Sequence, residues 1–229
     1  MKKRTGAKTY ELHNRQKVRM KVVLKIGGSL MEQADTLLNE VASHFNDRES
    51  KVKVVVVPGG GAFANVIREA SRTYSLSEEA SHWMAISAME QYAYLLNDRT
   101  DIPLIDDTEQ IPDGFSILLP YRLLKENDEL EHSWDVTSDT IAAWITKRIG
   151  AMLVKATDVD GVLNGDELIE EIPARELESM GETCTDRILP KILADYRMDC
   201  TIINGTYPGR VVAAIERKAV KGTYIKGNI

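Results

Sequence analysis

Cysteine is almost absent from this chain of 229 residues, which contains only Cys184 and Cys200. Two thiols are too few for a disulfide framework, and their spacing is not that of paired metal ligands. Protein thiols stay reduced inside the cell, where disulfides are rare. We therefore expect two free cysteines in a cytoplasmic protein.

Long apolar runs are also missing. No stretch approaches the roughly 20 consecutive apolar residues that span a bilayer, and the first residues carry charge without the apolar core of a secretory signal. The formal net charge is −6, which argues against nucleic acid as the main partner. The sequence therefore predicts neither a membrane nor a nucleic-acid partner.

The rest of the composition is that of a folded globular domain, with 43% hydrophobic and 28% charged residues. Residues 1–19 differ, because they carry seven Lys and Arg residues against the single acid Glu11. Such a segment is typical of a flexible basic extension, and we expect no catalytic role for it. We expect residues 20–229 to form one domain.

Apolar strand patterns alternate with helical patterns from Met20 onward. Strands are expected at residues 22–26, 53–57, 103–105, 116–119, 152–155, 201–203 and 222–225. Helices are expected at residues 30–46, 62–71, 78–98, 138–149, 188–197 and 209–218. Continuous apolar strands between helices indicate a parallel sheet that is covered on both faces. The predicted fold class is α/β, a three-layer α/β/α sandwich with a central, mostly parallel sheet and residues 222–225 at one edge.

Distinctive segments follow the predicted strand ends, where open parallel sheets bind ligands. Lys25 precedes Gly27-Gly28-Ser29, and the next apolar strand ends in Pro58-Gly59-Gly60-Gly61. A glycine turn before a helix lets backbone N–H groups approach an anion, and a lysine adds positive charge. The pattern indicates phosphate chemistry, although each glycine cluster alone is also compatible with a simple tight turn.

Five segments resemble, in the same order, motifs of the amino-acid kinase superfamily. They are Lys25–Ser29, Gly59–Gly61, Thr137–Ala143, Thr157–Val162 and Leu189–Lys191. The resemblance runs from about Met20 to the C-terminus. It implies the fold of that superfamily, ATP and Mg²⁺ as cofactors, a small-molecule phosphate acceptor and a homo-oligomer. It also implies an acceptor-side lobe at about residues 20–119 and a nucleotide-side lobe at residues 120–229.

The resemblance implies roles for particular residues. Lys25 and Lys191 would lie on either side of the transferred phosphoryl group, and Asp139 would orient both lysines and take part in Mg²⁺ binding. The nucleotide and its phosphates would be held by Gly27, Gly28, Ser29, Thr157, Asp158, Asp160 and Gly161. Taken alone, Asp139 could instead cap a helix, Lys191 could be a solvated lysine, and the two aspartates of the loop could build an Asx turn.

Three further segments resemble one branch of the superfamily, the kinases of methanofuran biosynthesis. They are residues 58–64, 81–92 and 132–139. These kinases use ATP to convert (5-(aminomethyl)furan-3-yl)methyl phosphate into the diphosphate. The resemblance implies acceptor binding by Gly59, Gly60, Gly61, Arg68 and Asp135.

The chemistry of this acceptor suggests partners for its other groups. Trp83, Trp134 or Tyr92 could pack on the ring, and Glu90 or Asp135 could pair with the ammonium group. The helical spacing of Trp83, Ile86 and Met89 equally fits a core position, and His82 near the same face would be a hydrogen-bonded core histidine.

Two other functions remain open. A uridylate kinase or another kinase with a phosphate acceptor would share the fold, although residues 125–132 lack the glycine-rich segment of uridylate kinases. A nucleotide-binding storage or regulatory protein would use the same pocket without catalysis.

Overall fold

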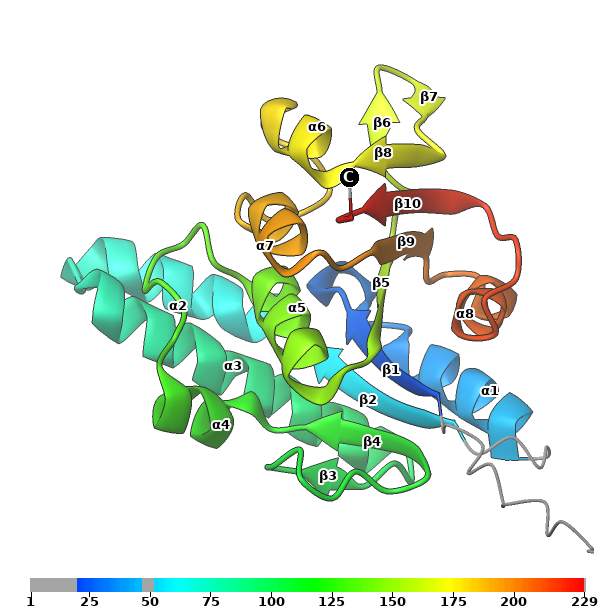
Figure 1. The fold of residues 1–229 in the computed structure, drawn as a ribbon. Coiled ribbons are helices and arrows are strands. Elements are labelled where there is room, and N and C mark those ends of the chain that lie inside the picture. Colours follow the sequence, from blue (N-terminus) through cyan, green and yellow to red (C-terminus); the bar gives the residue numbers. More distant parts are fainter. Residues whose placement is uncertain (1–19, 47–51, 229) are drawn as a thin grey trace, which may run out of the picture.

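The structure is a computed structural model that describes residues 20–46 and 52–228. The predicted basic extension, residues 1–19, lies outside the described residues. Eight strands form one sheet in the order β3-β4-β2-β1-β5-β9-β10-β8 (Figure 1). These strands are β1 (Lys21–Ile26), β2 (Lys53–Pro58), β3 (Leu104–Ile105), β4 (Gly114–Leu118), β5 (Met152–Thr157), β8 (Glu171–Pro173), β9 (Cys200–Asn204) and β10 (Gly222–Lys226). A separate hairpin pairs β6 (Leu163–Asn164) with β7 (Glu167–Leu168).

The strands nearest the middle of the sheet are the most apolar. β1 lies between β2 and β5 and is parallel to both, and five of its six residues are buried. Valine-rich strands suit this position because both of their faces are covered. β10 is antiparallel to β9, and β8 pairs with its far side. The prediction of an edge strand at residues 222–225 is therefore wrong, because the short β8 forms the edge.

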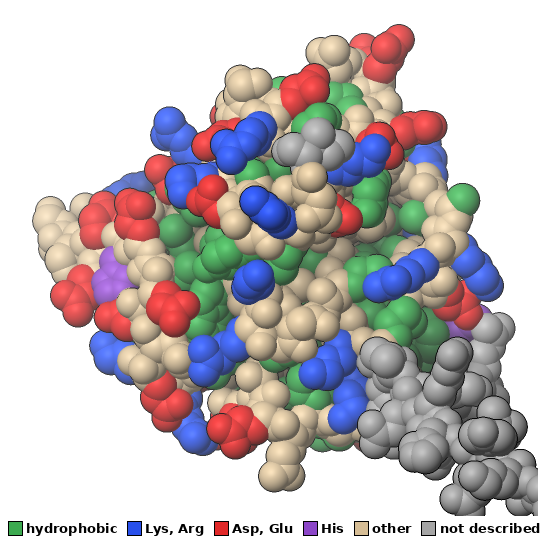
Figure 2. Space-filling view, in the orientation of Figure 1, with side chains coloured by type: hydrophobic (Ala, Val, Ile, Leu, Met, Phe, Trp, Pro, Cys, Tyr) green, Lys and Arg blue, Asp and Glu red, His purple; other side chains and the backbone are tan. Residues whose placement is uncertain are grey.

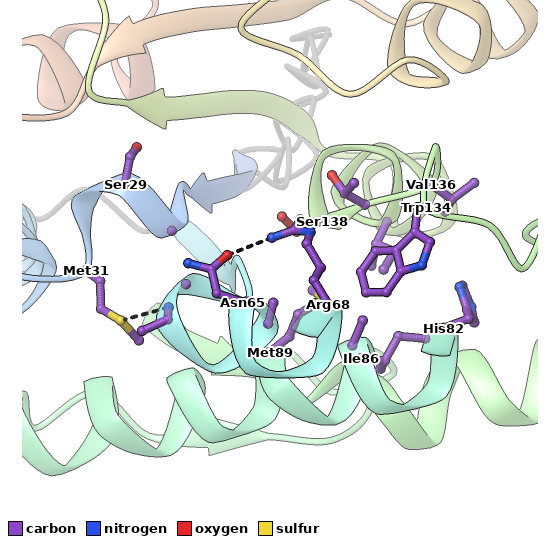
Figure 3. Close-up of a pocket in the computed structure, with 18 of the residues that line it drawn as sticks. Ser29, Met31, Asn65, Arg68, His82, Ile86, Met89, Trp134, Val136 and Ser138 are labelled. Carbon is purple, nitrogen blue, oxygen red and sulfur yellow. Dashed lines mark hydrogen bonds between the residues drawn. The ribbon is translucent and has the colours of Figure 1, made fainter. Parts of the chain in front are cut away.

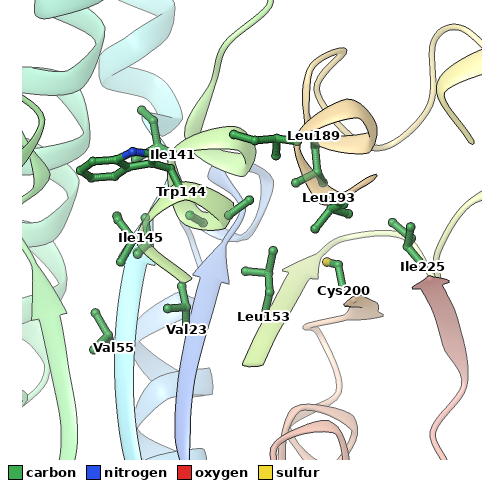
Figure 4. Close-up of a cluster of buried hydrophobic side chains, with 14 of the residues drawn as sticks. Val23, Val55, Ile141, Trp144, Ile145, Leu153, Leu189, Leu193, Cys200 and Ile225 are labelled. Atoms are coloured by element: carbon green, nitrogen blue, oxygen red, sulfur yellow. The ribbon is translucent and has the colours of Figure 1, made fainter. Parts of the chain in front are cut away.

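Helices cover both faces of the sheet. They are α1 (Ala34–Asn46), α2 (Gly61–Tyr74), α3 (Glu78–Arg99), α4 (Pro120–Asn127), α5 (Ser138–Ile149), α6 (Ala174–Ser179), α7 (Leu189–Tyr196), α8 (Pro208–Ile215) and the 3₁₀ turn η1 (Gly28–Leu30). Alternate residues of β1 point to opposite layers, so Val22 and Leu24 pack with α1 and α8, whereas Val23 packs with α5 and α7. Figure 4 shows Ile141, Trp144 and Ile145 of α5 over this second face.

This arrangement confirms the predicted three-layer α/β/α fold with a mostly parallel sheet. The chain places β2, β3 and β4 on one side of β1 and then returns to place β5 on the other side. Such a reversal of strand order creates a crevice beyond the carboxyl ends of the strands, which is where ligands of open α/β sheets bind. The division into lobes near residue 119 stays a prediction; α4, just beyond it, packs on α3.

The surface carries charges of both signs. On the face drawn in Figure 2, lysines and arginines are interspersed with acids and with small apolar areas. Within the described ranges, no helix has the length and apolarity needed to cross a membrane.

Candidate active site

Two glycine loops meet at the carboxyl ends of β1 and β2. A Cβ atom on Gly28 would lie 2.7 Å from the Cα atom of Gly61, and a Cβ atom on Gly59 would lie 2.9 Å from the nitrogen of Gly28. Side chains essentially never tolerate such distances to backbone atoms. Glycine is therefore required here because the backbones of the two loops touch, in addition to any role in anion binding.

Some backbone N–H groups of these loops have an acceptor within the protein, and others do not. Gly27 donates to the carbonyl oxygen of Ala156 at 2.9 Å, and Gly59 donates to that of Ile26 at 2.8 Å. These two glycines shape the loops and do not offer their N–H groups to phosphate, which corrects the sequence-based interpretation of Gly27. Within the described part of the chain, no acceptor takes the N–H groups of Gly28 and Gly61, which remain available to an anion.

A buried cluster of three charged side chains lies beside these loops. Asp139, in the first turn of α5, is 2.7 Å from the Lys25 ammonium through Oδ1 and accepts a hydrogen bond from Lys155 through Oδ2. Lys25 and Lys155 occupy paired positions on the neighbouring strands β1 and β5. All three side chains are at most 8% exposed. Two cations around one anion leave one net positive charge, which suits a phosphate ligand.

The cluster controls its own protonation. Burial alone would raise the pKa of Asp139, but the two neighbouring ammonium groups outweigh it and hold that pKa well below its ordinary range. Burial lowers the pKa of Lys25, and Asp139 only partly offsets this. For Lys155 the attraction of Asp139 exceeds the effect of burial and raises the pKa. Asp139 is therefore a fixed anion that orients cations, not a group that exchanges protons near neutral pH.

Lys191 lies outside this cluster. Its ammonium is 2.6 Å from Asp195, one turn along α7, and its side chain is 60% exposed. The prediction that Asp139 orients Lys191 is therefore wrong in this structure, because Lys155 occupies the second position on the carboxylate. A catalytic role for Lys191 stays a prediction that needs its long side chain to swing from Asp195 toward the phosphates.

Asp186, which sequence reasoning missed, joins the starts of α5 and α7. Its carboxylate accepts hydrogen bonds from the N–H and hydroxyl groups of Thr137 and Thr140, and from the N–H group of Leu189. Its own N–H group donates to Asp139 Oδ2 at 3.1 Å. Asp186 thus caps both helices and positions Asp139. The alternative that Asp139 itself is the helix cap is therefore wrong.

The predicted nucleotide loop follows β5. Burial would raise the pKa of Asp158, but hydrogen bonds that include one from Ser29 outweigh it and lower the pKa. Ser29 and Asp158 therefore bring the first glycine loop and this loop together. Thr157 donates to Asp158 at 3.1 Å. The roles of these residues in nucleotide binding stay predictions.

Asp160 and Gly161 have structural partners within the protein. Asp160 forms ion pairs with Lys221 and Arg210, which lower its pKa to about 2. Gly161 lies so close to the hydroxyl of Thr223 that a Cβ atom would clash with it. If these two residues bind the nucleotide, they do so in addition to these contacts. Their role in nucleotide binding stays a prediction.

A Mg²⁺ ion prefers carboxylate and water oxygens in an octahedral arrangement. Both Asp139 oxygens already face ammonium or N–H groups. Within the described residues, no group of three or more His, Cys, Asp or Glu side chains has a metal-binding arrangement. Asp139 is better placed to orient the lysines than to coordinate Mg²⁺.

A cavity of about 560 Å³ opens from Lys25 and the glycine loops. It runs along α3, and the loop before α5 forms its opposite wall. Its lining residues are Lys25, Gly28, Ser29, Met31, Glu32, Gly60, Gly61, Ala62, Ala64, Asn65, Arg68, Glu78, His82, Ala85, Ile86, Met89, Ser133, Trp134, Val136, Thr137, Ser138 and Ile141. Figure 3 shows Met89, Ile86 and His82 following one another along α3, with Trp134 between Arg68 and His82.

The cavity includes only part of the predicted acceptor site. Gly60, Gly61 and Arg68 line it, and the Arg68 guanidinium lies 5.3 Å from the centre of the Trp134 ring. Asp135 does not line it, because its half-exposed carboxylate points to Arg187 at 3.8 Å. Glu90 instead accepts a hydrogen bond from the N–H group of Tyr121, at the start of α4.

Three aromatic side chains of α3 differ in their surroundings. Trp83 and Tyr92 are buried in the core, which for Trp83 is the position that its helical spacing allowed. His82 is buried, as expected for a core histidine, but no hydrogen bond to its ring is found among the described residues. It lines the cavity and stacks on His132, with ring centres 4.4 Å apart. Burial, with a contribution from His132, lowers the pKa of His82 to about 4, so its imidazole is neutral at pH 7.

Comparison with known proteins agrees with this fold. The model of the amino acid kinase family matches residues 20–103 and 117–204, and the chain belongs to that family. It is similar to the (5-(aminomethyl)furan-3-yl)methyl phosphate kinase of Methanocaldococcus jannaschii, with 35% identity over 205 residues that cover 86% of this chain and 93% of that protein.

Uridylate kinases are more distant relatives. The uridylate kinase of Archaeoglobus fulgidus is 26% identical over 227 residues, which cover 90% of this chain and all of that enzyme. A crystal structure of uridylate kinase from that organism superposes with a TM-score of 0.67 at 22% identity and again covers 90% of this chain and all of that one. The UMP kinase of Ureaplasma parvum gives a TM-score of 0.65 at 15% identity, covering 91% and 99% of the two chains. These structures establish the likeness of fold.

Proposed function

We propose that the protein is an ATP-dependent kinase that transfers a phosphoryl group to the phosphate of (5-(aminomethyl)furan-3-yl)methyl phosphate and forms the diphosphate. The observation that carries the reaction class is the buried cluster of Lys25, Asp139 and Lys155, whose Lys25 lines one end of a cavity that two glycine loops border. The choice of acceptor rests on the 35% identity to the kinase that is named for it.

The proposed chemistry needs charge and position more than proton transfer. Phosphoryl transfer spreads negative charge over the oxygens of the moving group, and fixed cations stabilise that charge. Lys25 and Lys155 supply these cations, and Asp139 holds them in place. The attacking oxygen belongs to a phosphate that is already ionised near pH 7, so no strong base is required.

Each substrate has a proposed place. ATP enters as its Mg²⁺ complex, with its phosphates at Gly28 and Ser29 and the rest of the nucleotide toward residues 157–161. The acceptor phosphate lies at the N-terminus of α2, where the N–H group of Gly61 and the guanidinium of Arg68 favour an anion. A homo-oligomer, as the resemblance implies, and a cytoplasmic location, as expected from the two free cysteines, are part of this proposal.

Acceptor-dependent release of ADP from Mg·ATP tests the proposal. We expect turnover with the furan phosphate and little with UMP or without an acceptor. Turnover with UMP alone would replace the proposal by a uridylate kinase, which the relatives at 25–26% identity represent. Tight ATP binding without turnover of any acceptor would favour a storage or regulatory protein.

A further inference from the structure

The acceptor cavity has two chemically different ends. Its inner end carries Lys25 and the glycine loops. Its outer end follows a stripe of α3 in which Met89, Ile86, His82 and Glu78 are three or four residues apart and so share one face. With a rise of 1.5 Å per residue, this stripe extends about 16 Å from Met89 to Glu78. A ligand whose phosphate lies part-way along the cavity, between Gly61 and Arg68 of α2, therefore extends its other end along this stripe toward His82 and Glu78.

Four groups surround the outer end. Trp134 offers a ring face, and Glu78 offers a carboxylate. The hydroxyl oxygen of Ser133 is buried and has no hydrogen-bond partner within the described part of the chain. His82 lines the same end, and no hydrogen bond to its ring is found among the described residues. Together they form an anion, two uncommitted polar groups and an aromatic face. Arg68 brings a cation close to them, because its guanidinium lies 5.3 Å from the centre of the Trp134 ring.

Only two carboxylates line the cavity in the part of the chain that the structure describes, Glu32 and Glu78. Glu32 closely follows the first glycine loop and so belongs to the phosphate end. Glu78 belongs to the opposite end, at the first turn of α3. The distribution of charge along the cavity therefore matches a ligand with a phosphate at one end and a cation at the other.

We infer that the outer end of this cavity binds a primary ammonium group of the acceptor, with Glu78 as its counter-ion. This assignment rests on the proposed function and makes Glu78 a specificity-determining residue. A primary ammonium donates three hydrogen bonds, to the Glu78 carboxylate, the His82 imidazole and the Ser133 hydroxyl, and it is attracted to the Trp134 ring. A uracil base brings no cation and leaves the carboxylate without its partner, which is the basis for rejecting UMP.

The protonation of His82 is consistent with this role. Burial and the neighbouring His132 lower the pKa of His82 to about 4, so the imidazole is neutral and can accept a hydrogen bond. A protonated imidazole would instead repel the ammonium. The stack on His132, whose ring in turn contacts Asp128 at 2.7 Å, holds His82 against the cavity.

A comparison of two acceptors tests the inference. The substitution is Glu78→Gln, and the acceptors are the aminomethylfuran phosphate and the analogue with a hydroxymethyl group in place of the aminomethyl group. We expect kcat/KM for the aminomethyl acceptor to fall roughly 10- to 100-fold, mainly through KM, because a charge-assisted hydrogen bond is lost. The value for the hydroxymethyl analogue should stay within about twofold. Glu79→Gln is the matched control, since Glu79 lies in the same first turn but does not line the cavity.

The outcomes separate the two levels of the proposal. Equal losses for both acceptors in Glu78→Gln, or no loss for either, would overturn the ammonium site while the kinase assignment stands. A larger selective loss in Glu32→Gln than in Glu78→Gln would also overturn it, because the cation would then lie at the other end. If the wild-type protein turns over neither furan acceptor, the proposed function itself fails and the ammonium site fails with it.

Discussion

Lys25 and Lys155 sit at paired positions on β1 and β5, and both reach the carboxylate of Asp139. Removing two ammonium groups from water is costly. The Asp139 carboxylate, together with the Cys184 carbonyl oxygen that accepts a hydrogen bond from Lys155 at 2.6 Å, compensates for only part of this cost. A binding site whose cations already lack solvent therefore gains strongly from an incoming phosphate. At the scale of single residues, this uncompensated positive charge is the physical basis of the proposed phosphoryl transfer.

Lys25→Met and Lys155→Met test this charge directly. Each should lower kcat about 10²- to 10³-fold, the usual cost of losing one group that stabilises a transition state, with a smaller change in the KM for ATP. Steady-state kinetics measure both values. Lys147→Met, at an exposed position of α5, is the control. Turnover at the wild-type level in either variant of the cluster would contradict the proposed mechanism.

The neutral His82 predicts a pH dependence of stability. Its pKa is about 4 in the folded protein and about 6.5 when it is exposed in the unfolded chain. Between these values the unfolded state binds more protons, so stability should decrease as the pH falls from about 6.5 to about 4. Urea unfolding at pH 7 and pH 5 measures this decrease, and His82→Asn should make it smaller. An equal decrease in the variant would show that other groups cause it.

At the scale of elements, the site depends on two contacts between segments that are far apart in the sequence. The glycine loops after β1 and β2 touch through their backbones. Asp186 connects the starts of α5 and α7 and, through its N–H group, Asp139. Both contacts fix the lysine cluster relative to the cavity.

Gly28→Ala should destabilise the protein and abolish activity, because its Cβ would lie 2.7 Å from the Cα atom of Gly61 and only a backbone shift can relieve that contact. Gly209→Ala is the matched control. It lies within α8 with nothing within 4 Å of its Cβ, so it should keep or raise stability by roughly 0.5–1 kcal/mol. Thermal unfolding compares the two variants. Equal stability of Gly28→Ala and the wild type would show that the loops do not need close contact.

Asp186→Ala should lower the free energy of unfolding by at least about 1–3 kcal/mol, because several buried N–H and hydroxyl groups lose their acceptor. It should also lower kcat, since Asp139 loses the contact that positions it. Asp195→Ala, at an exposed position of α7, is unsuitable as a control for kcat because Asp195 contacts Lys191. Asp166→Ala, in the exposed turn of the β6–β7 hairpin, is suitable. Wild-type stability and kcat in Asp186→Ala would contradict this role.

At the scale of the whole molecule, the sequence predicts the layers and the position of the site. Apolar strands between helices indicate a parallel sheet, and the rule that ligands bind at strand ends places Lys25 and the glycine loops together. Asp139 was added by the family resemblance alone. Lys155 was missed because it lies inside a strand, where a lysine gives no turn or motif signal. The available signal was its place near the carboxyl end of β5, matching that of Lys25 in β1. Asp186 was missed because its partners come from two other segments, which only tertiary structure brings together.

The sequence also does not predict where a long, exposed side chain points. Lys191 belongs to one of the family motifs, yet in the structure it pairs with Asp195. Asp135 likewise turns to Arg187 instead of the cavity. Surface ion pairs of this kind contribute little free energy and are easily exchanged. Motif position alone therefore does not determine which of these side chains reaches the ligand.

Phosphorus NMR of a competition reaction tests the central claim most directly. The protein is given Mg·ATP with equal concentrations of (5-(aminomethyl)furan-3-yl)methyl phosphate and UMP, and the two possible diphosphate products are resolved in one spectrum. The account predicts that the furan diphosphate forms first and that UDP stays minor. Formation of UDP with the furan phosphate left unchanged would contradict it.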